Sequence, residues 1–461
     1  MSEERIRKIL EKQREFFRTG ATKSYSFRMD ALKKLSCVIK EKEQAIFDAL
    51  KKDLGKGEFE SRSTETNMVL EEIHHMRKNL KRYMKTKRVG VSMLNLPASG
   101  KVMPEPYGVA LIFSAWNYPF QLLFSPLVSA VAAGNCVMVK TAEQSGETAK
   151  VCKEIIEQVF PEEFVACWNG GRDLGEKLLK EKYDFLFYTG GINGGKAVMA
   201  SAAESLTPLV LELGGKSPCI VDEDAKLPLS AKRIVWGKFL NAGQTCVAPD
   251  YILVHESIKE KLLDALKKEI IRFYGEDASL SEDYPRIVSK AHCQRLAGLL
   301  QKSETKIVYG GKYNIEERFF EPTLIDSPDA DSPVMGEEIF GPILPVLGVK
   351  NMEEAIDFVI ARAKPLALYY FSHGRKNLDR ILSCTSSGGV CVNETIMHFV
   401  NQSMPFGGVG ASGFGSYHGK YGFDAFTHYK AIMLKGDLVD MPVRYPPGLE
   451  KRIPLLKMIS R

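Results

Sequence analysis

The stretch "VALIFSAWNYPFQLLFSPLVSAVAAGNCVMV", residues 109–139, contains no charged residue and constrains how the rest of the chain can fold. As one helix it would be long enough to cross a bilayer. Residues typical of turns interrupt it: Asn117, Pro119, Pro126, Gly134 and Asn135. The remaining pieces have the pattern of a strand, a helix and a strand buried inside an α/β domain. We therefore predict an α/β fold and no membrane span.

Short apolar runs alternate with helical stretches beyond this segment, which is typical of parallel sheets covered by helices. The first series consists of "VALIFSAW" (109–116), "CVMVKTA" (136–142), "FVACWNGG" (164–171), "FLFYTGG" (185–191) and "LVLELGG" (209–215). A second series consists of "YILVHESI" (251–258), "TKIVYGG" (305–311), "GPILPVLGV" (341–349), "ALYYFS" (367–372) and "GGVCVNE" (388–394). Two α/β units are expected.

The two ends of the chain carry different patterns. Up to about residue 90 the apolar positions recur every three or four residues, which predicts helices, and the first 20 residues resemble an amphipathic surface helix rather than a signal peptide. Residues 425–436 alternate enough to form a strand. The basic, proline-rich segment 444–461 lacks an anchoring apolar tail, so it is either a mobile end or an arm that packs on a partner subunit.

Composition excludes several classes of protein. The chain has 461 residues, of which 44% are apolar, so two or three packed units are expected. Its charge of +6 comes from 63 basic and 57 acidic residues that are interspersed, which argues against a nucleic-acid partner. Nine cysteines without a C-x-x-C pair indicate a reduced, cytoplasmic protein. The histidine spacings fit no zinc pattern, so no metal site is predicted.

In parallel sheets the ligand lies beyond the carboxyl ends of the strands, so polar residues there are candidates for a site. Gly190, Gly191, Gly194 and Gly195 follow one predicted strand and open a helix, an arrangement that suits a pyrophosphate. Their spacing is not G-x-G-x-x-G, so a structural turn is an equally good interpretation. Lys140 and Glu143 follow another strand and could bind the two hydroxyls of a ribose, although a solvated charge pair is the more common situation.

Glu212, Cys246 and Asn117 are candidates for catalysis. Burial at the end of an apolar run should raise the pKa of Glu212 and fit it to move a proton near neutral pH, although a structural carboxylate is the alternative. Cys246 in "NAGQTC" has small neighbours that leave access to its sulfur, and nearby N–H donors would lower its pKa and hold an oxyanion. Asn117 can supply an amide donor of that kind. A buried, inert cysteine remains the alternative for Cys246.

Together these stretches resemble the aldehyde dehydrogenase family. The motifs "WNYPF", "KTAEQ", "YTGGINGG", "LELGGKSP", "NAGQTC", "EEIFGP" and "PFGGVGASGFG" occur in the family's order between about residues 100 and 430. Glu212 stands 34 residues before Cys246, which resembles the family's spacing of base and nucleophile. The short N-terminal region and "GSYHGKYGFDAFTHYK" resemble the class 3 branch, in which substrates tend to be medium or long aliphatic, or aromatic, aldehydes.

The resemblance implies a role for each candidate residue. Cys246 would be the nucleophile, Glu212 the base and Asn117 an oxyanion donor in the NAD- or NADP-dependent oxidation of an aldehyde to its acid. Contacts with the cofactor would come from the ribose ligands Lys140 and Glu143, the pyrophosphate loop Gly190, Gly191 and Gly195, and the nicotinamide-side residues Glu338 and Phe340. Gly191 replaces a common serine and Thr141-Ala142 replaces Pro-Ser. Both departures leave the choice between NAD and NADP open.

The family also implies an organisation of the chain. Residues 1–83 and 105–212 would form a Rossmann-type NAD(P)-binding domain, and residues 213–423 a catalytic domain. Residues 84–104 and 424–461 would form a small β element for oligomerisation, with a homodimer expected and a tetramer as the alternative. Apart from the resemblance, the apolar side chains Phe399, Phe406 and Phe414 are candidates for a substrate wall, with ordinary core packing as the alternative.

Two other functions are compatible with these motifs. A dehydrogenase that transfers the acyl group to coenzyme A would use the same nucleophile, although a hydrolytic base at Glu212 argues against it. A non-catalytic protein that keeps the fold, as some lens crystallins do, is less consistent with the intact set Asn117, Glu212 and Cys246.

Overall fold

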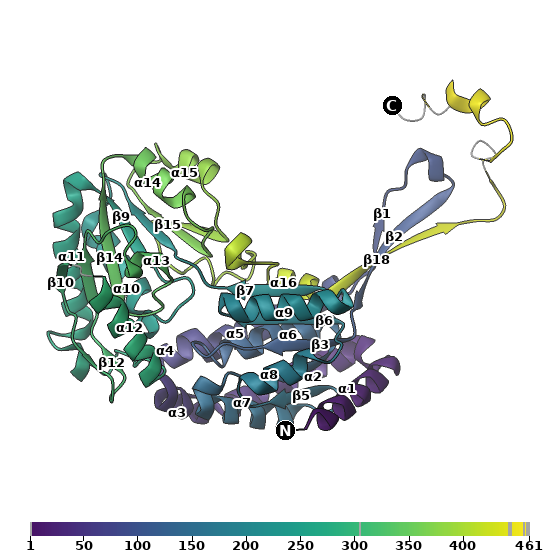
Figure 1. Ribbon diagram of the computed structural model, residues 1–461. Helices are drawn as coiled ribbons and strands as arrows, with labels where there is room; N and C mark the ends of the chain where they lie inside the picture. The colour runs from purple at the N-terminus through teal and green to yellow at the C-terminus, as the bar shows by residue number, and fades with distance from the viewer. Residues whose placement is uncertain (1, 304–305, 441–444, 455–456, 458–461) are drawn as a thin grey trace.

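Two large sheets and two small ones organise the chain in this computed structural model, which describes residues 2–303, 306–440, 445–454 and 457 (Figure 1). The first large sheet has the order β17-β7-β6-β3-β4-β5. Its strands are β3 (Val109–Phe113), β4 (Cys136–Lys140), β5 (Val165–Trp168), β6 (Phe185–Gly190), β7 (Leu209–Leu213) and β17 (Gly413–Phe414). All of these neighbours run parallel except β17 and β7.

The charge-free segment forms the centre of this sheet, as predicted. β3 and β4 are neighbouring parallel strands, and all thirteen residues of the helix between them, α6 (Gln121–Ala133), are buried. The backbone N–H and C=O groups of this segment form hydrogen bonds within the sheet and the helix. Its apolar side chains are buried in the protein interior and not in lipid. Within the described part of the chain, no helix has the length and apolar character needed to span a membrane.

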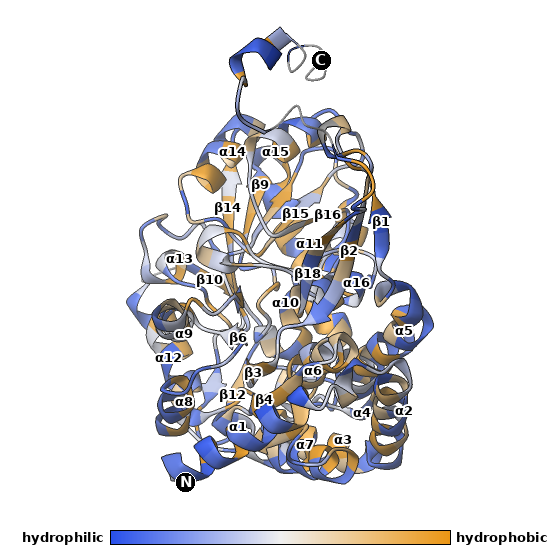
Figure 2. Ribbon diagram, turned by 90° about the vertical axis from the view of Figure 1, so that its right-hand side faces the viewer, coloured by the Kyte–Doolittle hydropathy of each residue, from blue (hydrophilic) through white to orange (hydrophobic). Residues whose placement is uncertain are grey.

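The N-terminal helices pack around this sheet as expected from their periodicity. They are α1 (Glu3–Arg18), α2 (Tyr25–Glu41), α3 (Glu43–Leu54), α4 (Glu58–Ser61) and α5 (Asn67–Tyr83), with the π-helical turn η2 (Arg62–Thr66) before α5. Further helices on the sheet are α7 (Gly146–Val159), α8 (Arg172–Leu179), α9 (Ile192–Ser205) and α16 (Gly419–Ala425). α1 buries Ile6, Ile9 and Leu10 and is largely hydrophilic elsewhere (Figure 2).

The second large sheet has the order β10-β13-β14-β9-β8-β15-β16. Its strands are β8 (Pro218–Val221), β9 (Tyr251–His255), β10 (Lys306–Tyr309), β13 (Thr323–Asp326), β14 (Ile343–Val349), β15 (Ala367–Phe371) and β16 (Gly389–Val392). The helices of this lobe are α10 (Leu227–Phe239), α11 (Lys259–Tyr274), α12 (Lys290–Lys302), α13 (Pro333–Gly336), α14 (Met352–Ile360) and α15 (Leu378–Cys384). The four-residue strands β8 and β13 were not among the runs singled out in the sequence.

A three-stranded antiparallel sheet projects from the body (Figure 1). It contains β1 (Lys87–Val89), β2 (Ala98–Pro106) and β18 (Thr427–Lys435), while β11 (Tyr313–Asn314) and β12 (Phe319–Phe320) form a separate pair. The strand predicted at 425–436 is thus confirmed, and all nine of its residues pair with β2. Of the predicted arm 444–461, residues 445–454 and 457 are described, with the short turn η10 (Glu450–Arg452); the rest lies outside the described residues.

The order of the first sheet reverses next to β3. The chain proceeds from β3 to β4 and β5 on one side, and then from β6 to β7 on the other. A crevice opens beyond the carboxyl ends of the strands at such a switch point. The polar residues that follow β3, β4 and β6 therefore lie together at one edge of the sheet.

Candidate active site

Cys246 stands on a sharply turned loop between α10 and β9. Asn241, Ala242 and Gly243 all have left-handed backbone, with φ of 51°, 51° and 76°. A Cβ at Gly243 would lie 2.3 Å from the Gly341 carbonyl oxygen, so only glycine fits there. The loop ends with Cys246 half-buried at the wall of a cavity of about 710 Å³.

Hydrogen bonds within the loop and to two distant segments of the chain fix its conformation. Gln244 donates through Nε2 to the Asn241 carbonyl at 2.9 Å, and its Oε1 accepts from the Val288 N–H at 2.8 Å. The Asn241 N–H donates to Glu60 Oε1 at 3.0 Å. Because these bonds come from three separate segments, the conformation before Cys246 depends on the tertiary fold.

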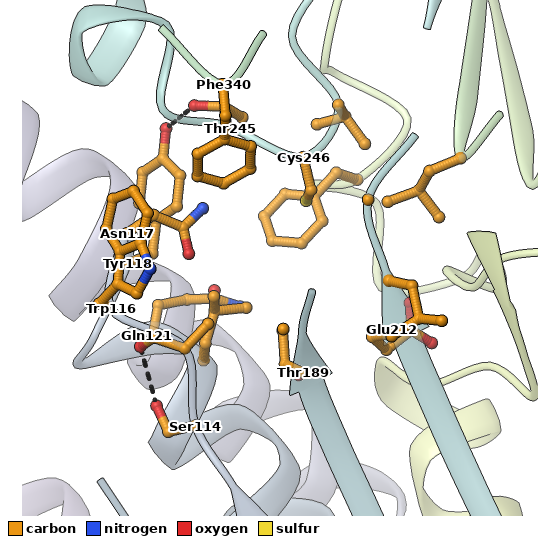
Figure 3. Close-up of a pocket in the computed structure, with 18 of the residues that line it drawn as sticks. Ser114, Trp116, Asn117, Tyr118, Gln121, Thr189, Glu212, Thr245, Cys246 and Phe340 are labelled. Atoms are coloured by element: carbon orange, nitrogen blue, oxygen red, sulfur yellow. Dashed lines mark hydrogen bonds between the residues drawn. The ribbon is translucent and has the colours of Figure 1, made fainter. Parts of the chain in front are cut away.

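Most of the predicted site residues line the same cavity (Figure 3). Those that do are Asn117, Lys140, Gly190, Gly191, Glu212, Cys246, Glu338 and Phe340. In Figure 3 Asn117 and Glu212 lie on opposite sides of the cavity, with Cys246 on the loop above them. Two predicted residues, Glu143 and Gly195, do not line it.

Asn117 follows β3 and contacts the nucleophile loop directly. Its Nδ2 donates to the Gln244 carbonyl at 3.0 Å, and its own carbonyl accepts from Asn241 Nδ2 at 2.8 Å. An amide nitrogen has two hydrogens, so one remains for another acceptor in the cavity. Tyr118 and Thr245, which the sequence reasoning missed, share a hydrogen bond of 2.6 Å across the same junction.

Glu212 lies on β7, in register with Thr189 on β6. Its carboxylate is buried, and neither oxygen has a hydrogen-bond partner among the described residues. Burial raises the pKa of Glu212 well above its ordinary value, in the direction expected from the sequence. A buried acid without a structural partner is available to hold or move a proton.

The glycine turn between β6 and α9 has the geometry of an anion-binding site although the spacing of its glycines is unusual. Gly191 caps α9 without a side chain, and a Cβ there would meet no atom within 4 Å. The first N–H groups of the helix therefore face open space and suit a phosphate. Gly195 has a different role: a Cβ there would lie 2.8 Å from Leu213, so it allows α9 to pack on β7.

Lys140 and Glu143 lie near each other at the end of β4, where Lys140 is half-buried and Glu143 exposed. Burial lowers the pKa of Lys140, while Glu143 opposes that shift. A Cβ at Gly171 would lie 2.0 Å from Glu143 Oε2, so the carboxylate rests on the glycines that follow β5. Lys140 lines the same cavity as Gly190 and Gly191 of the glycine turn, whereas Glu143 does not.

Glu338 and Phe340 enter the cavity from the second lobe. A Cβ at Gly214 would lie 2.0 Å from Glu338 Oε2, and burial raises the pKa of Glu338 to about 8. Phe340 has left-handed backbone with φ of 52° and packs edge-on against Trp116 at 5.2 Å. His292 contacts the Phe340 carbonyl at 2.8 Å through Nε2, so the position of Phe340 is well defined.

Comparison with known proteins identifies the family. The family model described as "Aldehyde dehydrogenase family" matches residues 1–432. The chain is 47% identical over 432 residues to 4,4'-diaponeurosporen-aldehyde dehydrogenase of Staphylococcus aureus, covering 94% of each protein. It is 44% identical over 447 residues to aldehyde dehydrogenase family 3 member A2 of Rattus norvegicus, covering 96% of this chain and 92% of the relative.

The chain belongs to the aldehyde dehydrogenase family. A solved structure, the "Substrate bound state of Staphylococcus Aureus AldH", is similar with a TM-score of 0.96 and 44% identity, covering 99% of both chains. The predicted family, its class 3 branch and the α/β fold are confirmed. The protein is an oxidoreductase that oxidises an aldehyde to the acid with NAD or NADP.

The thiol of this aldehyde dehydrogenase differs from the expectation in one respect. Burial raises the pKa of Cys246, the nearby Glu338 and Glu212 act in the same direction, and the backbone N–H groups of Cys246 and Val247 only partly oppose them. The sequence suggested a lowered pKa because it revealed the N–H donors and not the depth of burial. The protein alone therefore favours the neutral thiol.

Many apolar side chains line the cavity that contains Cys246. Phe399 and Phe406 are among them, as predicted, but Phe414 is not: it lies on β17 and is partly exposed. The sequence reasoning missed the other members of this wall: Met68, Leu122, Trp236, Leu240, Ile396, Met397, Val400 and Tyr417. They come from four separate regions, so no local motif indicates them. No cluster of His, Cys, Asp or Glu suited to a metal occurs in the described ranges.

Replacing Gly243 by alanine should disturb the nucleophile loop of the dehydrogenase. Left-handed backbone costs a non-glycine residue about 1 kcal/mol, and the clash with the Gly341 carbonyl adds to it. We expect a lower melting temperature and a fall in kcat of at least about tenfold, because small displacements of reacting groups are costly.

The matched control is Gly298→Ala in α12. A Cβ at Gly298 meets no atom within 4 Å, so this variant should keep full activity and equal or higher stability. Thermal melts and steady-state rates of the two variants provide the measurement. Equal melting temperatures and equal steady-state rates in the two variants would contradict the backbone strain expected from a side chain at position 243.

Proposed function

We propose that Cys246 is the nucleophile of this aldehyde dehydrogenase, Glu212 its base and Asn117 its oxyanion donor. The observation that carries the proposal is that these three side chains, from a loop, a strand and a strand end, line one cavity. Glu212 has no structural hydrogen bond in the described chain, which leaves its carboxylate available for proton transfer.

In the first half of the reaction the Cys246 thiol releases its proton to solvent water, and the resulting thiolate adds to the aldehyde carbon. The carbonyl oxygen becomes an oxyanion, held by the free hydrogen of the Asn117 amide and by the Cys246 N–H. Such donors stabilise the charge that develops in the transition state, each contributing about a hundredfold to a thousandfold in rate. Held by the residues at the sheet edge, NAD(P)⁺ would supply the acceptor for the hydride of the aldehyde carbon. The product on Cys246 is a thioester.

In the second half Glu212 takes a proton from water, and the resulting hydroxide attacks the thioester carbon. The C–S bond breaks, the carboxylic acid leaves, and Glu212 returns its proton to the Cys246 sulfur, which restores the thiol. The raised pKa of Glu212 suits this step, because a base with a pKa nearer neutrality accepts a proton more readily.

The residues near the sheet edge fit a dinucleotide. We assign the pyrophosphate to the first N–H groups of α9, with Gly190 and Gly191 giving access and Gly195 setting the helix against the sheet. Lys140 and Glu143 would hold a ribose, and Glu338 and Phe340 would hold the nicotinamide side. The open space at Gly191, where a Cβ would meet no atom within 4 Å, supports this assignment because it leaves the start of α9 accessible to a phosphate.

The substrate is proposed to be a medium- or long-chain aliphatic aldehyde or an aromatic one. The apolar wall that contains Trp236, Ile396 and Phe399 supports this class, since burial of such chains in an apolar pocket is favourable. Steady-state rates across a panel of aldehydes, with NAD and NADP in parallel, test it. We expect kcat/KM to rise with chain length; a preference for short, charged aldehydes would contradict the proposal.

Formation of acyl-CoA on addition of coenzyme A would favour the acylating alternative.

We also propose the domain roles given above: cofactor binding by residues 1–83 and 105–212, catalysis by 213–423, and dimerisation through 84–104 and 424–461. β17 joins the first sheet although it lies within the catalytic range. β18 is an edge strand and exposes Met433 and Leu434, which suits pairing with a second copy. All nine cysteines are free thiols, which supports a cytoplasmic location.

A further inference from the structure

A buried ion pair lies beside the cavity without lining it. Lys56 Nζ and Glu65 Oε1 are 2.6 Å apart, and both side chains are fully buried. Lys56 lies between α3 and α4, and Glu65 lies in the π-helical turn η2. Burying two charges is costly, so such a pair is weak evidence for stability and raises the question of what it holds in place. Single π-helical turns are frequent at functional sites.

The ammonium group of Lys56 holds the backbone of the proposed oxyanion donor. Nζ donates to the Asn117 carbonyl at 3.1 Å and lies 4.0 Å from the centroid of the Tyr118 ring. The Tyr118 hydroxyl is in turn bonded to Thr245, next to the nucleophile (Figure 3). One cation therefore contacts two consecutive residues of the loop between β3 and α6.

The carboxylate of Glu65 holds the other end of the same loop. Its Oε2 accepts from the N–H groups of Phe120 and Gln121, at 3.1 and 2.9 Å. These groups open α6, whose own N-cap residue supplies no capping side chain. Glu65 thus caps α6 from a distant helix, where a negative charge is favoured.

The loop fixed in this way also contacts the nucleophile loop. Asn117 receives a hydrogen bond from Asn241 and donates one to the Gln244 carbonyl, two residues before Cys246. A shift of the Asn117 peptide would therefore move its amide relative to the sulfur. The buried charge pair therefore affects the position of the Asn117 amide, although it does not contact the reacting atoms.

We infer that the Lys56–Glu65 pair positions the oxyanion donor, by fixing residues 117–121 so that the Asn117 amide points at the oxygen of the thiohemiacetal. This inference rests on the proposed roles of Asn117 and Cys246. Lys56 and Glu65 are positioning residues, because they act through the backbone of the loop and not on the substrate.

The test is the rate of the first-turnover burst of NAD(P)H in the full-length enzyme. Lys56→Met keeps the length of the side chain and removes its donors, and should slow the burst about tenfold, since misplacing a reacting group by a fraction of an ångström is costly. KM for the aldehyde should change by less than about threefold, because the apolar wall is untouched. Glu65→Gln should have a smaller effect, as an amide oxygen can still accept from α6.

Arg28→Met is the matched control for lost stability. Arg28 is also buried and donates to the carbonyls of Thr22 and Ala132, the latter at the far end of α6. This variant should lower the melting temperature as Lys56→Met does, and leave the burst rate unchanged. An equal slowing in Arg28→Met would mean that general loosening of α6 explains the effect, and would overturn the inference.

A double-mutant cycle with Asn117→Ala separates the inference from the function on which it rests. With Asn117 already removed, Lys56→Met should slow the burst by less than about twofold, because coupled residues are not additive. A full tenfold effect in both backgrounds would overturn the positioning role. A normal burst in Asn117→Ala alone would instead refute the oxyanion donor. If Lys56→Met does not fold, Glu65→Ala, which removes both the ion pair and the bonds to Phe120 and Gln121, is taken through the same cycle with the same two outcomes.

Discussion

Replacing Cys246 by alanine should abolish aldehyde oxidation, with a loss in kcat on the order of 10⁴-fold or more, as for other covalent nucleophiles. Without the sulfur no thiohemiacetal forms, so the burst of NAD(P)H should vanish together with steady turnover. The cavity keeps its other walls, and the aldehyde should still bind. Stopped-flow absorbance of the reduced cofactor, together with a binding measurement, checks both expectations.

The control for this variant is Cys384→Ala, since Cys384 is an exposed free thiol outside the cavity. It should retain full activity. Turnover that persists in Cys246→Ala would refute the role of Cys246 as the nucleophile.

The pH dependence of the wild-type enzyme adds a second check. Because burial raises the pKa of Cys246, the burst rate should increase as the pH rises and the thiolate forms.

Glu212→Gln should separate the two halves of the reaction. The first turnover should still produce a burst of NAD(P)H, since the addition step needs only the sulfur and the oxyanion donors. Turnover should then stall, with kcat lower by about 10² to 10⁴-fold, because no base activates the water. Mass spectrometry should find the acyl group on Cys246. Normal steady turnover would show that the base lies elsewhere.

The same variant has an effect on stability whose sign follows from the raised pKa. A carboxyl group whose pKa is higher in the folded protein opposes folding as the pH rises from its ordinary value of 4.5 toward the raised one. Glutamine has no such penalty. The melting temperature of Glu212→Gln minus that of the wild-type protein should therefore increase as the pH rises. A difference that does not change with pH would argue against an unpartnered buried carboxylate.

Local sequence was sufficient for much of the fold. All ten of the apolar runs singled out in the sequence correspond to strands, because buried strands leave short apolar runs that turn residues separate. The order of the motifs around Asn117, Glu212 and Cys246 was enough to indicate the family. The four-residue strands β8 and β13 were not among the runs singled out.

Local sequence was not sufficient for the contacts within the site. Phe414 was grouped with Phe399 and Phe406 by residue type, yet it lies on β17 outside the cavity. Nothing in the segment 56–65 indicated that Lys56 and Glu65 form a pair, since they are nine residues apart and one of them lies in a π-helical turn.

The amino-acid sequence by itself determined the secondary structure, the glycine turn and the identities of the candidate catalytic residues, because these depend on neighbours along the chain. Only the tertiary structure decided that burial raises the pKa of Cys246, that Glu212 has no hydrogen-bond partner in the described chain, and that a distant ion pair holds Asn117. Burial and hydrogen bonding depend on groups that are far apart in sequence, and their effects on charge appear only once those groups are packed together.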